Sequence, residues 1–263
     1  GWSAPVTPMD NSLAANTMYL VQPFFSQSGT SVVKISTLTG VIPAVTWNNA
    51  TATFTPSPQG NYSFSGLGNA APQKNESRGL QTNDGRFAQA IMRNGRIWAV
   101  HHVVPSGGAS RTAIQWWQFN TNGTVVQNGR IDDTDGKIFR TFPSLAVNAS
   151  EDMVIGYSIF SKGIFPSGAY AVRKACAPLN TVSNESIFKE GVSNYFKNFG
   201  GTRARWGDYS YTSQDPITGN FWTVQQVADQ RVGGADSDSR WATWWAEVQP
   251  GVSNAVNFGS PVS

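Results

Sequence analysis

The fold is decided by three similar runs of sequence: Ile97-Trp98-Ala99-Val100-His101-His102-Val103, Met153-Val154-Ile155-Gly156-Tyr157-Ser158-Ile159 and Phe221-Trp222-Thr223-Val224-Gln225-Gln226-Val227. Each run is apolar and β-rich, a strand-like segment precedes it across a tight turn, and another β-rich segment follows it. A weaker copy is Met18-Tyr19-Leu20-Val21-Gln22-Pro23-Phe24. Repetition of one strand–turn–strand unit indicates a repeat architecture, and repeated antiparallel strands favour a β-propeller.

The clearest repeat begins with a predicted strand over residues 87–92, followed by a hairpin turn at Arg93-Asn94-Gly95. An Asn-Gly pair suits this turn because both central positions require a positive φ. The other three strands of the unit are expected at residues 97–103, 112–119 and 124–131. Four antiparallel strands in sequence make one propeller blade.

The whole chain, residues 1–263, is expected to form a single β-propeller domain of four-stranded antiparallel blades. Its recognisable repeats cover approximately residues 16–47, 86–132, 141–192 and 205–250. Four blades is the lower limit for propellers, so the chain is predicted to be a ring of four or five blades or a part of a larger ring. A β-sandwich shares the alternation and the turn spacing, and it is the alternative fold.

The longest segment between these repeats and the two ends of the chain have expected roles of their own. Residues 48–85, rich in Asn, Pro, Gly and Ser, are expected to be an irregular loop. Residues 1–15 and 249–263 flank the repeats and could close the ring by pairing with each other, which would remove exposed sheet edges.

The composition restricts the classes of partner. Charged residues make up 13% of the chain, about half of the ~25% usual in soluble domains. The net charge is +3 and the basic residues are scattered, whereas a nucleic-acid-binding protein shows a concentrated basic stripe. No apolar run reaches the ~20 residues that a membrane-spanning helix needs. We therefore expect neither nucleic acid binding nor membrane insertion, and the single cysteine, Cys176, excludes an intrachain disulfide.

Several blocks of sequence carry a family resemblance: Thr82-Asn83-Asp84-Gly85-Arg86, Arg93-Asn94-Gly95-Arg96-Ile97-Trp98, Phe142-Pro143-Ser144-Leu145-Ala146-Val147-Asn148 and Arg205-Trp206-Gly207-Asp208-Tyr209-Ser210, with Asp215-Pro216 and Phe221-Trp222. Over residues 16–250 the chain resembles a group of secreted, mostly bacterial β-propeller proteins, some of which carry a sialidase-like label. The resemblance implies a propeller fold and an extracellular location, either secreted or at the cell surface.

The sialidase-like label implies a particular site. Sialidases carry Ser-x-Asp-x-Gly-x-x-Trp boxes, three arginines that clamp a carboxylate, a tyrosine activated by a glutamate, and an aspartate acid. Here Ser213-Gln214-Asp215 leads to Gly219, two positions too late for the box, and no glutamate lies near the motifs in sequence.

Six residues of suitable type form the set of ligand-binding candidates: Asp84, Arg86, His101, Arg205, Asp208 and Tyr209. Arginine binds carboxylates through two hydrogen bonds, and paired carboxyl groups perform acid–base work in glycoside hydrolysis. Charged residues of this kind also tie loops to neighbouring blades in repeat proteins, and this structural role is favoured over catalysis. We expect Asp208 to accept hydrogen bonds from loop amides or from an arginine, Arg86 or Arg205.

Two features bear on metal binding. Adjacent residues of a strand face opposite sides, so His101 and His102, the only histidines, cannot both bind one metal from a regular strand. The segment Asp132-Asp133-Thr134-Asp135-Gly136 resembles part of a calcium loop, in which oxygen ligands alternate around a glycine turn. The rest of that pattern is absent, so an acidic β-turn is the default, and calcium held by Asp133 and Asp135 is the only cofactor considered.

Six Asn-x-Ser/Thr acceptors for N-glycosylation occur, most of them in predicted loops: Asn49, Asn61, Asn75, Asn122, Asn148 and Asn184.

The sequence favours an extracellular, non-enzymatic binding or assembly module that recognises glycans or a protein partner. The alternatives are a sialidase-like glycoside hydrolase and a structural subunit of an extracellular assembly. Adjacent tryptophans at Trp116-Trp117 and Trp244-Trp245 fit the glycan hypothesis, because one residue of each pair could be exposed and stack on a sugar ring.

Overall fold

The computed structural model describes residues 3–12, 14–25, 31–54, 62–63, 67–208, 210–250 and 256–258. Within these ranges every regular element is a β-strand except for one short 3-10 helix, η1 (Asp236–Asp238). The prediction of an all-β fold is confirmed. No helix in the described part of the chain is long and apolar enough to cross a membrane.

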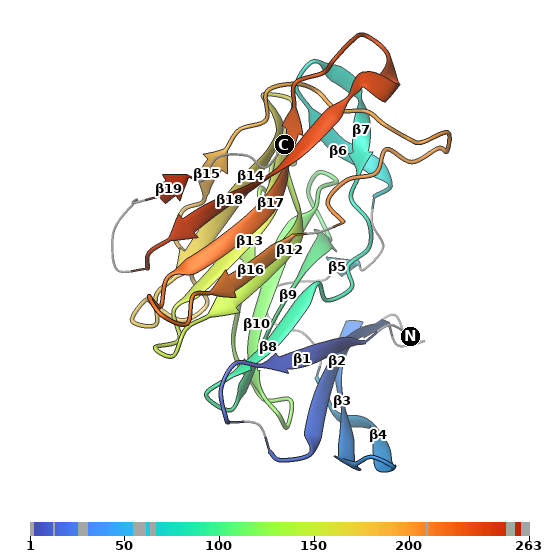
Figure 1. Ribbon diagram of the computed structural model, residues 1–263. Helices are drawn as coiled ribbons and strands as arrows, with labels where there is room; N and C mark the ends of the chain where they lie inside the picture. Colours follow the sequence, from blue (N-terminus) through green and yellow to red (C-terminus); the bar gives the residue numbers. More distant parts are fainter. Residues whose placement is uncertain are drawn as a thin grey trace.

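Three four-stranded antiparallel units follow one another along the chain (Figure 1). The first contains β8 (Gln89–Arg93), β9 (Arg96–Pro105), β10 (Ala113–Asn120) and β11 (Val125–Ile131). The second contains β12 (Ile138–Val147), β13 (Met153–Ser161), β14 (Ile164–Arg173) and β15 (Ser186–Lys189). The third contains β16 (Tyr211–Gln214), β17 (Phe221–Asp229), β18 (Arg240–Val248) and β19 (Val256–Phe258). These units coincide with the three predicted repeats from residue 86 onward.

The predicted hairpin turn between β8 and β9 is confirmed. Asn94 and Gly95 have φ values of 52° and 71°, as this type of two-residue turn requires. The three apolar runs from the sequence all become the second strand of their four-stranded unit, β9, β13 and β17. The repeat in the sequence is therefore a repeat of sheets.

The N-terminal repeat differs from the expected separate blade. Its strands are β1 (Ala4–Pro8), β2 (Thr17–Phe25), β3 (Ser31–Val41) and β4 (Ala44–Phe54). Strand β1 pairs with β2 and also runs parallel to β8, so these strands and the β8–β11 unit form one continuous sheet. The expected pairing of the two chain ends is not found in the described ranges, where β1 pairs with β2 and β8 and β19 pairs with β18.

The segment 48–85 was wrongly predicted to be irregular throughout. Strand β4 extends to Phe54, β5 (Tyr62–Ser63) pairs with β9, and β6 (Asn69–Gln73) and β7 (Glu76–Gln81) form a hairpin. The hairpin turns at Asn75, whose φ is 58°. Apolar and polar residues alternate only weakly along this hairpin, because many of its contacts with the rest of the protein are polar. One of them is the hydrogen bond from Gln73 Nε2 to the Tyr195 carbonyl at 2.7 Å.

Apolar side chains join the sheets face to face. One face of the β8–β11 unit packs on β1–β3, through a cluster that includes Val21, Val33, Ile35, Trp117 and Phe119. Its other face packs on β12–β14, through a cluster that includes Trp98, Trp116, Leu145, Ile155 and Tyr157. The β12–β15 sheet then packs on β16–β19, through Ala146, Val154, Tyr170, Phe221 and Val248. Both members of the Trp116-Trp117 pair are thus buried in cores, so the expectation of an exposed ring at this pair is wrong.

The first strands of the three sheets, β8, β12 and β16, lie near one another and are linked by buried polar contacts. Gln89 Oε1 accepts from the Leu145 amide at 3.0 Å, and the hydroxyls of Ser144 and Thr212 are 2.7 Å apart. Gln225 Nε2 donates to Ser144 Oγ at 3.3 Å. These bonds fix the spacing of the first strands, which position the site described next.

Candidate functional site

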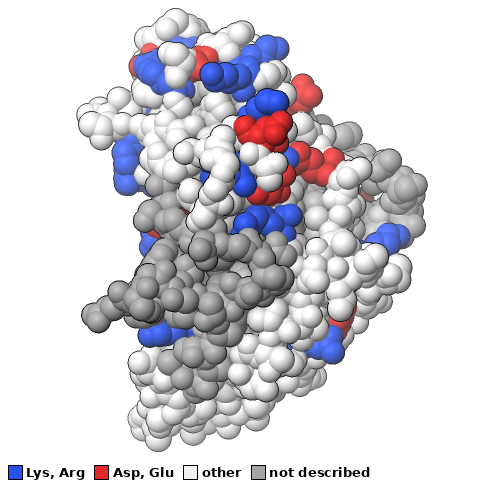
Figure 2. Space-filling model, turned by 180° about the vertical axis from the view of Figure 1, so that it is seen from behind, with Lys and Arg blue, Asp and Glu red and all other residues white. Residues whose placement is uncertain are grey.

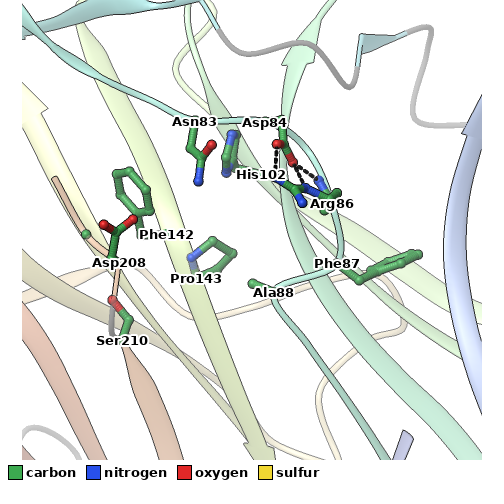
Figure 3. A pocket seen from close by; sticks show the side chains of 11 residues that line it. Asn83, Asp84, Arg86, Phe87, Ala88, His102, Phe142, Pro143, Asp208 and Ser210 are labelled. Atoms are coloured by element: carbon green, nitrogen blue, oxygen red, sulfur yellow. Dashed lines mark hydrogen bonds and ion pairs between the residues drawn. The ribbon is translucent and has the colours of Figure 1, made fainter. Parts of the chain in front are cut away.

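A cavity of about 330 Å³ lies where the first strands of the three sheets begin. Four segments line it: the loop before β8, the strand β9, a bulge in β12, and the segment before β16. The lining residues are Asn83, Asp84, Arg86, Phe87, Ala88, His102, Phe142, Pro143, Gly207, Asp208 and Ser210. Figure 3 shows Asp84 and Arg86 on one side of this cavity and Asp208 and Ser210 on the opposite side, with Pro143 between them.

The two histidines of β9 hold the loop of residues 83–88 from opposite faces of the sheet. His101 Nδ1 lies 2.8 Å from the Gly85 carbonyl, and its Nε2 accepts from Trp117 Nε1 at 3.1 Å. Because an indole N–H can only donate, this contact requires that His101 carry its proton on Nδ1. His102 faces the other way, beside Phe142. The prediction that the two rings point to opposite sides is confirmed.

His102, and not the predicted His101, is the histidine that lines the cavity. His102 is only 4% exposed, and its Nε2 has no hydrogen-bond partner among the described residues. Burial lowers the pKa of His102 to about 4, against smaller raising effects from the charge of Asp84 and the Asn83 backbone bond. The ring is therefore neutral at pH 7, and Nε2 can accept or donate a hydrogen bond according to the tautomer of the ring.

A second unpartnered polar atom lines the same cavity. Ser210 Oγ is buried and has no partner in the described part of the chain. Buried polar atoms are nearly always hydrogen-bonded, so each exception requires an explanation. Both His102 and Ser210 thus bring a covered polar atom without an internal partner to the wall of this cavity.

Asp84 and Arg86 form an ion pair at the cavity wall. Arg86 Nε donates to Asp84 Oδ1 at 2.6 Å, and the Arg86 amide donates to the same oxygen at 3.1 Å. Burial alone would raise the pKa of Asp84, but the bonds and the charge of Arg86 outweigh it and hold this pKa below its ordinary value. Asp84 is thus an anion at neutral pH, and it is unsuited to act as a proton donor.

The Arg205-Trp206-Gly207-Asp208 block forms the opposite wall of the cavity, and it depends on two tight contacts. The buried Trp206 ring donates from Nε1 to Ser158 Oγ at 3.2 Å and packs edge-on against Phe160 and Tyr195. Gly207 has a φ of 73°, and a Cβ at this position would lie 2.3 Å from the ring of Phe142. Only glycine fits there.

Asp208 pairs with Arg205, as expected, since Arg205 Nη2 donates to Asp208 Oδ2 at 2.6 Å. The pair lies at the surface, because the two side chains are 50% and 38% exposed. Arg205 lines a neighbouring cavity and not the first one. Tyr209, the remaining candidate, lies outside the described residues.

Because this pair is exposed, Asp208→Asn is expected to have a small effect on stability. We expect the free energy of unfolding to fall by less than about 1 kcal/mol, because water screens an exposed pair. Urea denaturation would measure this change. Asp132→Asn is the matched control, since Asp132 pairs at 2.6 Å with a nearly buried Arg111, and there we expect a loss of about 3 kcal/mol. An equal loss in both variants would contradict the assignment of the Asp208 pair to the surface.

The calcium hypothesis receives no support from the geometry. Asp133 Oδ2 accepts from the amides of Lys137 and Ile138 at 2.8 Å, and Asp135 pairs with Lys137 Nζ at 3.0 Å. These contacts are those of an acidic turn. Across the described ranges, no group of three or more His, Cys, Asp or Glu side chains is placed to hold a metal ion.

The glycosylation acceptors differ in accessibility. Four are exposed, namely Asn49, Asn75, Asn122 and Asn184. Asn148 is half-buried, and its Nδ2 donates to Asp152 at 3.1 Å, which makes it the least accessible of the described acceptors. Asn61 lies outside the described residues.

Charge is mixed on the face seen in Figure 2, where basic and acidic side chains lie beside one another over the described surface. A continuous basic stripe is not visible on this face. The expectation that the chain does not bind nucleic acid stays a prediction.

Comparison with known proteins finds likeness in structure alone. No protein-family model matches the chain, and neither does any curated protein. The fold is similar to an endo-arabinase from Bacteroides thetaiotaomicron, with 12% identity and a TM-score of 0.47 over 93% of this chain and 74% of that one. It is also similar to a thermostable family-43 glycoside hydrolase, with 12% identity and a TM-score of 0.39 over 94% and 72% of the two chains. At these scores the likeness is partial, and the function has to be inferred from the cavity itself.

Proposed function

We propose that this chain is an extracellular β-propeller module that binds a neutral, hydroxyl-rich glycan in the cavity between its first strands. The propeller assignment is supported by the repeated four-stranded units and by their face-to-face packing in chain order. The extracellular location rests on the resemblance to secreted propeller proteins and on the low charge of the chain. Protein recognition and a structural role in an assembly stay as alternatives.

The observation that carries the proposal is the pair of unpartnered atoms, His102 Nε2 and Ser210 Oγ, in one cavity. A nitrogen of a neutral imidazole accepts or donates a hydrogen bond according to the tautomer, and the serine hydroxyl can do both. A sugar hydroxyl can do both, so a sugar can satisfy both atoms at once. Phe142, Pro143 and Phe87 add apolar surface at the cavity wall, as is common in small-molecule sites.

The charges of the cavity favour a neutral ligand over an ionic one. Asp84 is already paired with Arg86, and Asp208 with Arg205. A charged ligand would have to compete with one of these internal pairs. A neutral polyol can instead accept from or donate to the paired groups without breaking the pair.

A glycan array followed by calorimetry tests the proposal. We expect Ser210→Ala to weaken binding of the strongest array hit about three- to tenfold, which corresponds to one lost hydrogen bond. The melting temperature should not change, because Ser210 Oγ has no internal partner to lose. Ser213→Ala is the control, since Ser213 lies three residues further on, in β16, and does not line the cavity.

Two outcomes would overturn this assignment. If no glycan on the array binds the wild-type chain, the proposed function is wrong. If a glycan binds but Ser210→Ala and Ser213→Ala retain wild-type affinity, the binding site lies elsewhere on the molecule.

Glycoside hydrolysis is the second candidate, because Asp84 and Asp208 both line the cavity and lie on opposite sides of it (Figure 3). Hydrolysis needs one carboxyl group that is protonated at working pH and one that is ionised. Asp84, held ionised by Arg86, could fill only the second role. Asp208 is paired with Arg205, and no glutamate lines the cavity among the described residues, so no unpaired carboxyl group is available there as the acid. These facts rank binding above hydrolysis. Turnover of chromogenic glycosides that is lost in Asp208→Asn, with stability retained, would reverse this ranking.

A further inference from the structure

A second cavity, of about 250 Å³, lies beside the first and has a different chemical character. The two cavities share Gly207 and Asp208, so they lie on either side of one short backbone segment. The first is lined largely by charged and polar groups, whereas the walls of the second include Tyr195, Phe199, Trp206 and Trp241.

Trp241 is the aromatic residue best placed to receive a ligand. It lies on β18 opposite Ala228, and it is 51% exposed while lining the cavity. Phe199, from the segment before the Arg-Trp-Gly-Asp block, is 69% exposed at the same cavity. Large aromatic rings left half in water beside a cavity favour a binding role, because their burial on binding is favourable.

Polar groups accompany these rings at the edge of the cavity. Gln226 and Thr243 are cross-strand neighbours on β17 and β18, and both line it. The side-chain oxygen Oε1 of Gln226 accepts a hydrogen bond from the Gly207 amide at 2.8 Å. This bond orients the Gln226 side chain toward the backbone segment that the two cavities share. An aromatic platform with amide and hydroxyl groups at its edge suits a sugar ring, whose faces are apolar and whose rim is polar.

Because the two cavities adjoin at Gly207 and Asp208, we infer that the second cavity is a further subsite for the same neutral glycan. In this subsite, Trp241 stacks on one of the sugar rings of the glycan. The inference rests on the proposed function of the first cavity. The ligand is then an oligosaccharide that crosses Asp208, and not a single sugar. The affinity should depend on chain length, because only longer chains reach Trp241.

Calorimetric titration of the full chain with neutral oligosaccharides of two and of six units, from xylan, mannan and arabinan, tests this inference. We expect Trp241→Ala to weaken binding of a six-unit chain about tenfold or more, as loss of a large buried apolar surface does. Binding of two-unit chains should stay at the wild-type level, whereas Ser210→Ala should weaken both lengths. Trp47→Ala is the matched control, since Trp47 is 48% exposed on β4 and lines neither cavity.

The possible failures separate the two proposals. If Ser210→Ala weakens both lengths while Trp241→Ala weakens neither, the second subsite is wrong and the first cavity stands. If Trp241→Ala weakens both lengths equally, Trp241 contacts the first sugar and the two-cavity path is wrong. If none of the six oligosaccharides binds the wild-type chain, the subsite is overturned, and the glycan array then decides the proposed function.

Discussion

Replacement of Arg93 by methionine is expected to lower the free energy of unfolding by about 3 kcal/mol. Arg93 is the last residue of β8 and is 7% exposed. Its guanidinium donates to the Val147 carbonyl at 3.1 Å, the Met9 carbonyl at 2.9 Å and Gln214 Oε1 at 2.8 Å. One side chain thus ties β8 to the ends of β1, β12 and β16. Methionine leaves three acceptors without their donor, at about 1 kcal/mol each.

Thermal unfolding measures this effect, and for a chain of this size we expect the melting temperature to fall by roughly 6–10 °C. Arg96→Met is the control, because Arg96 lies just across the turn and is half-exposed, with Glu151 at 3.3 Å. A screened pair of this kind contributes less than about 1 kcal/mol. Equal melting temperatures for the two variants would show that Arg93 does not join the sheets.

The second large effect is a loss of stability between pH 6.5 and pH 4, caused by the two buried histidines. Burial lowers the pKa of His101 to about 3 and that of His102 to about 4, whereas an unfolded histidine has a pKa near ~6.5. A charged His101 would also turn a second N–H donor toward the Trp117 indole, which itself donates to Nε2. The folded state therefore resists protonation at both rings.

The sign of the pH effect follows from proton linkage. Above pH ~6.5 both states are neutral at these rings, and the full stability is present. As the pH falls through ~6.5, the unfolded state binds protons that the folded state does not bind, so the free energy of unfolding decreases. Each histidine contributes a slope of up to ~1.4 kcal/mol per pH unit, and the loss continues until the folded rings titrate near pH 4 and 3.

Two measurements test this prediction. Urea denaturation from pH 7 to pH 4.5 should show the decrease, and a His101→Gln, His102→Gln double variant should have a flatter profile even if it is less stable at pH 7. Since the chain has only two histidines, their imidazole proton resonances in the folded protein should not move between pH 8 and about pH 5. A titration midpoint near 6.5 for both rings would overturn the account of their burial.

Part of the candidate site could be predicted from sequence, because some of its residues lie in recognisable motifs. Asp84, Arg86 and Asp208 were named from their blocks, and all three line the cavity. His102 and Ser210 were not named as ligand-binding residues. Alternation along β9 required that one histidine face each side, but it could not say on which side the cavity lies. Ser210 is the last residue of the Arg-Trp-Gly-Asp-Tyr-Ser block, and its place in this motif is the sequence feature that could have indicated a role in the site.

The sequence by itself determined the main strands of the three repeats from residue 86 onward and the hairpin turn at Asn94-Gly95. These depend on local causes, namely alternation along each strand and the positive φ that the turn residues adopt. Tertiary structure alone decided that β1 joins the N-terminal strands to β8, that both Trp116 and Trp117 are buried, and that the Arg205–Asp208 pair is exposed. It also brought together the loop before β8, the bulge in β12 and the segment before β16, which lie far apart in the sequence. Contacts between segments so distant depend on how whole sheets pack, and no local pattern in the chain encodes which side chains then share a cavity.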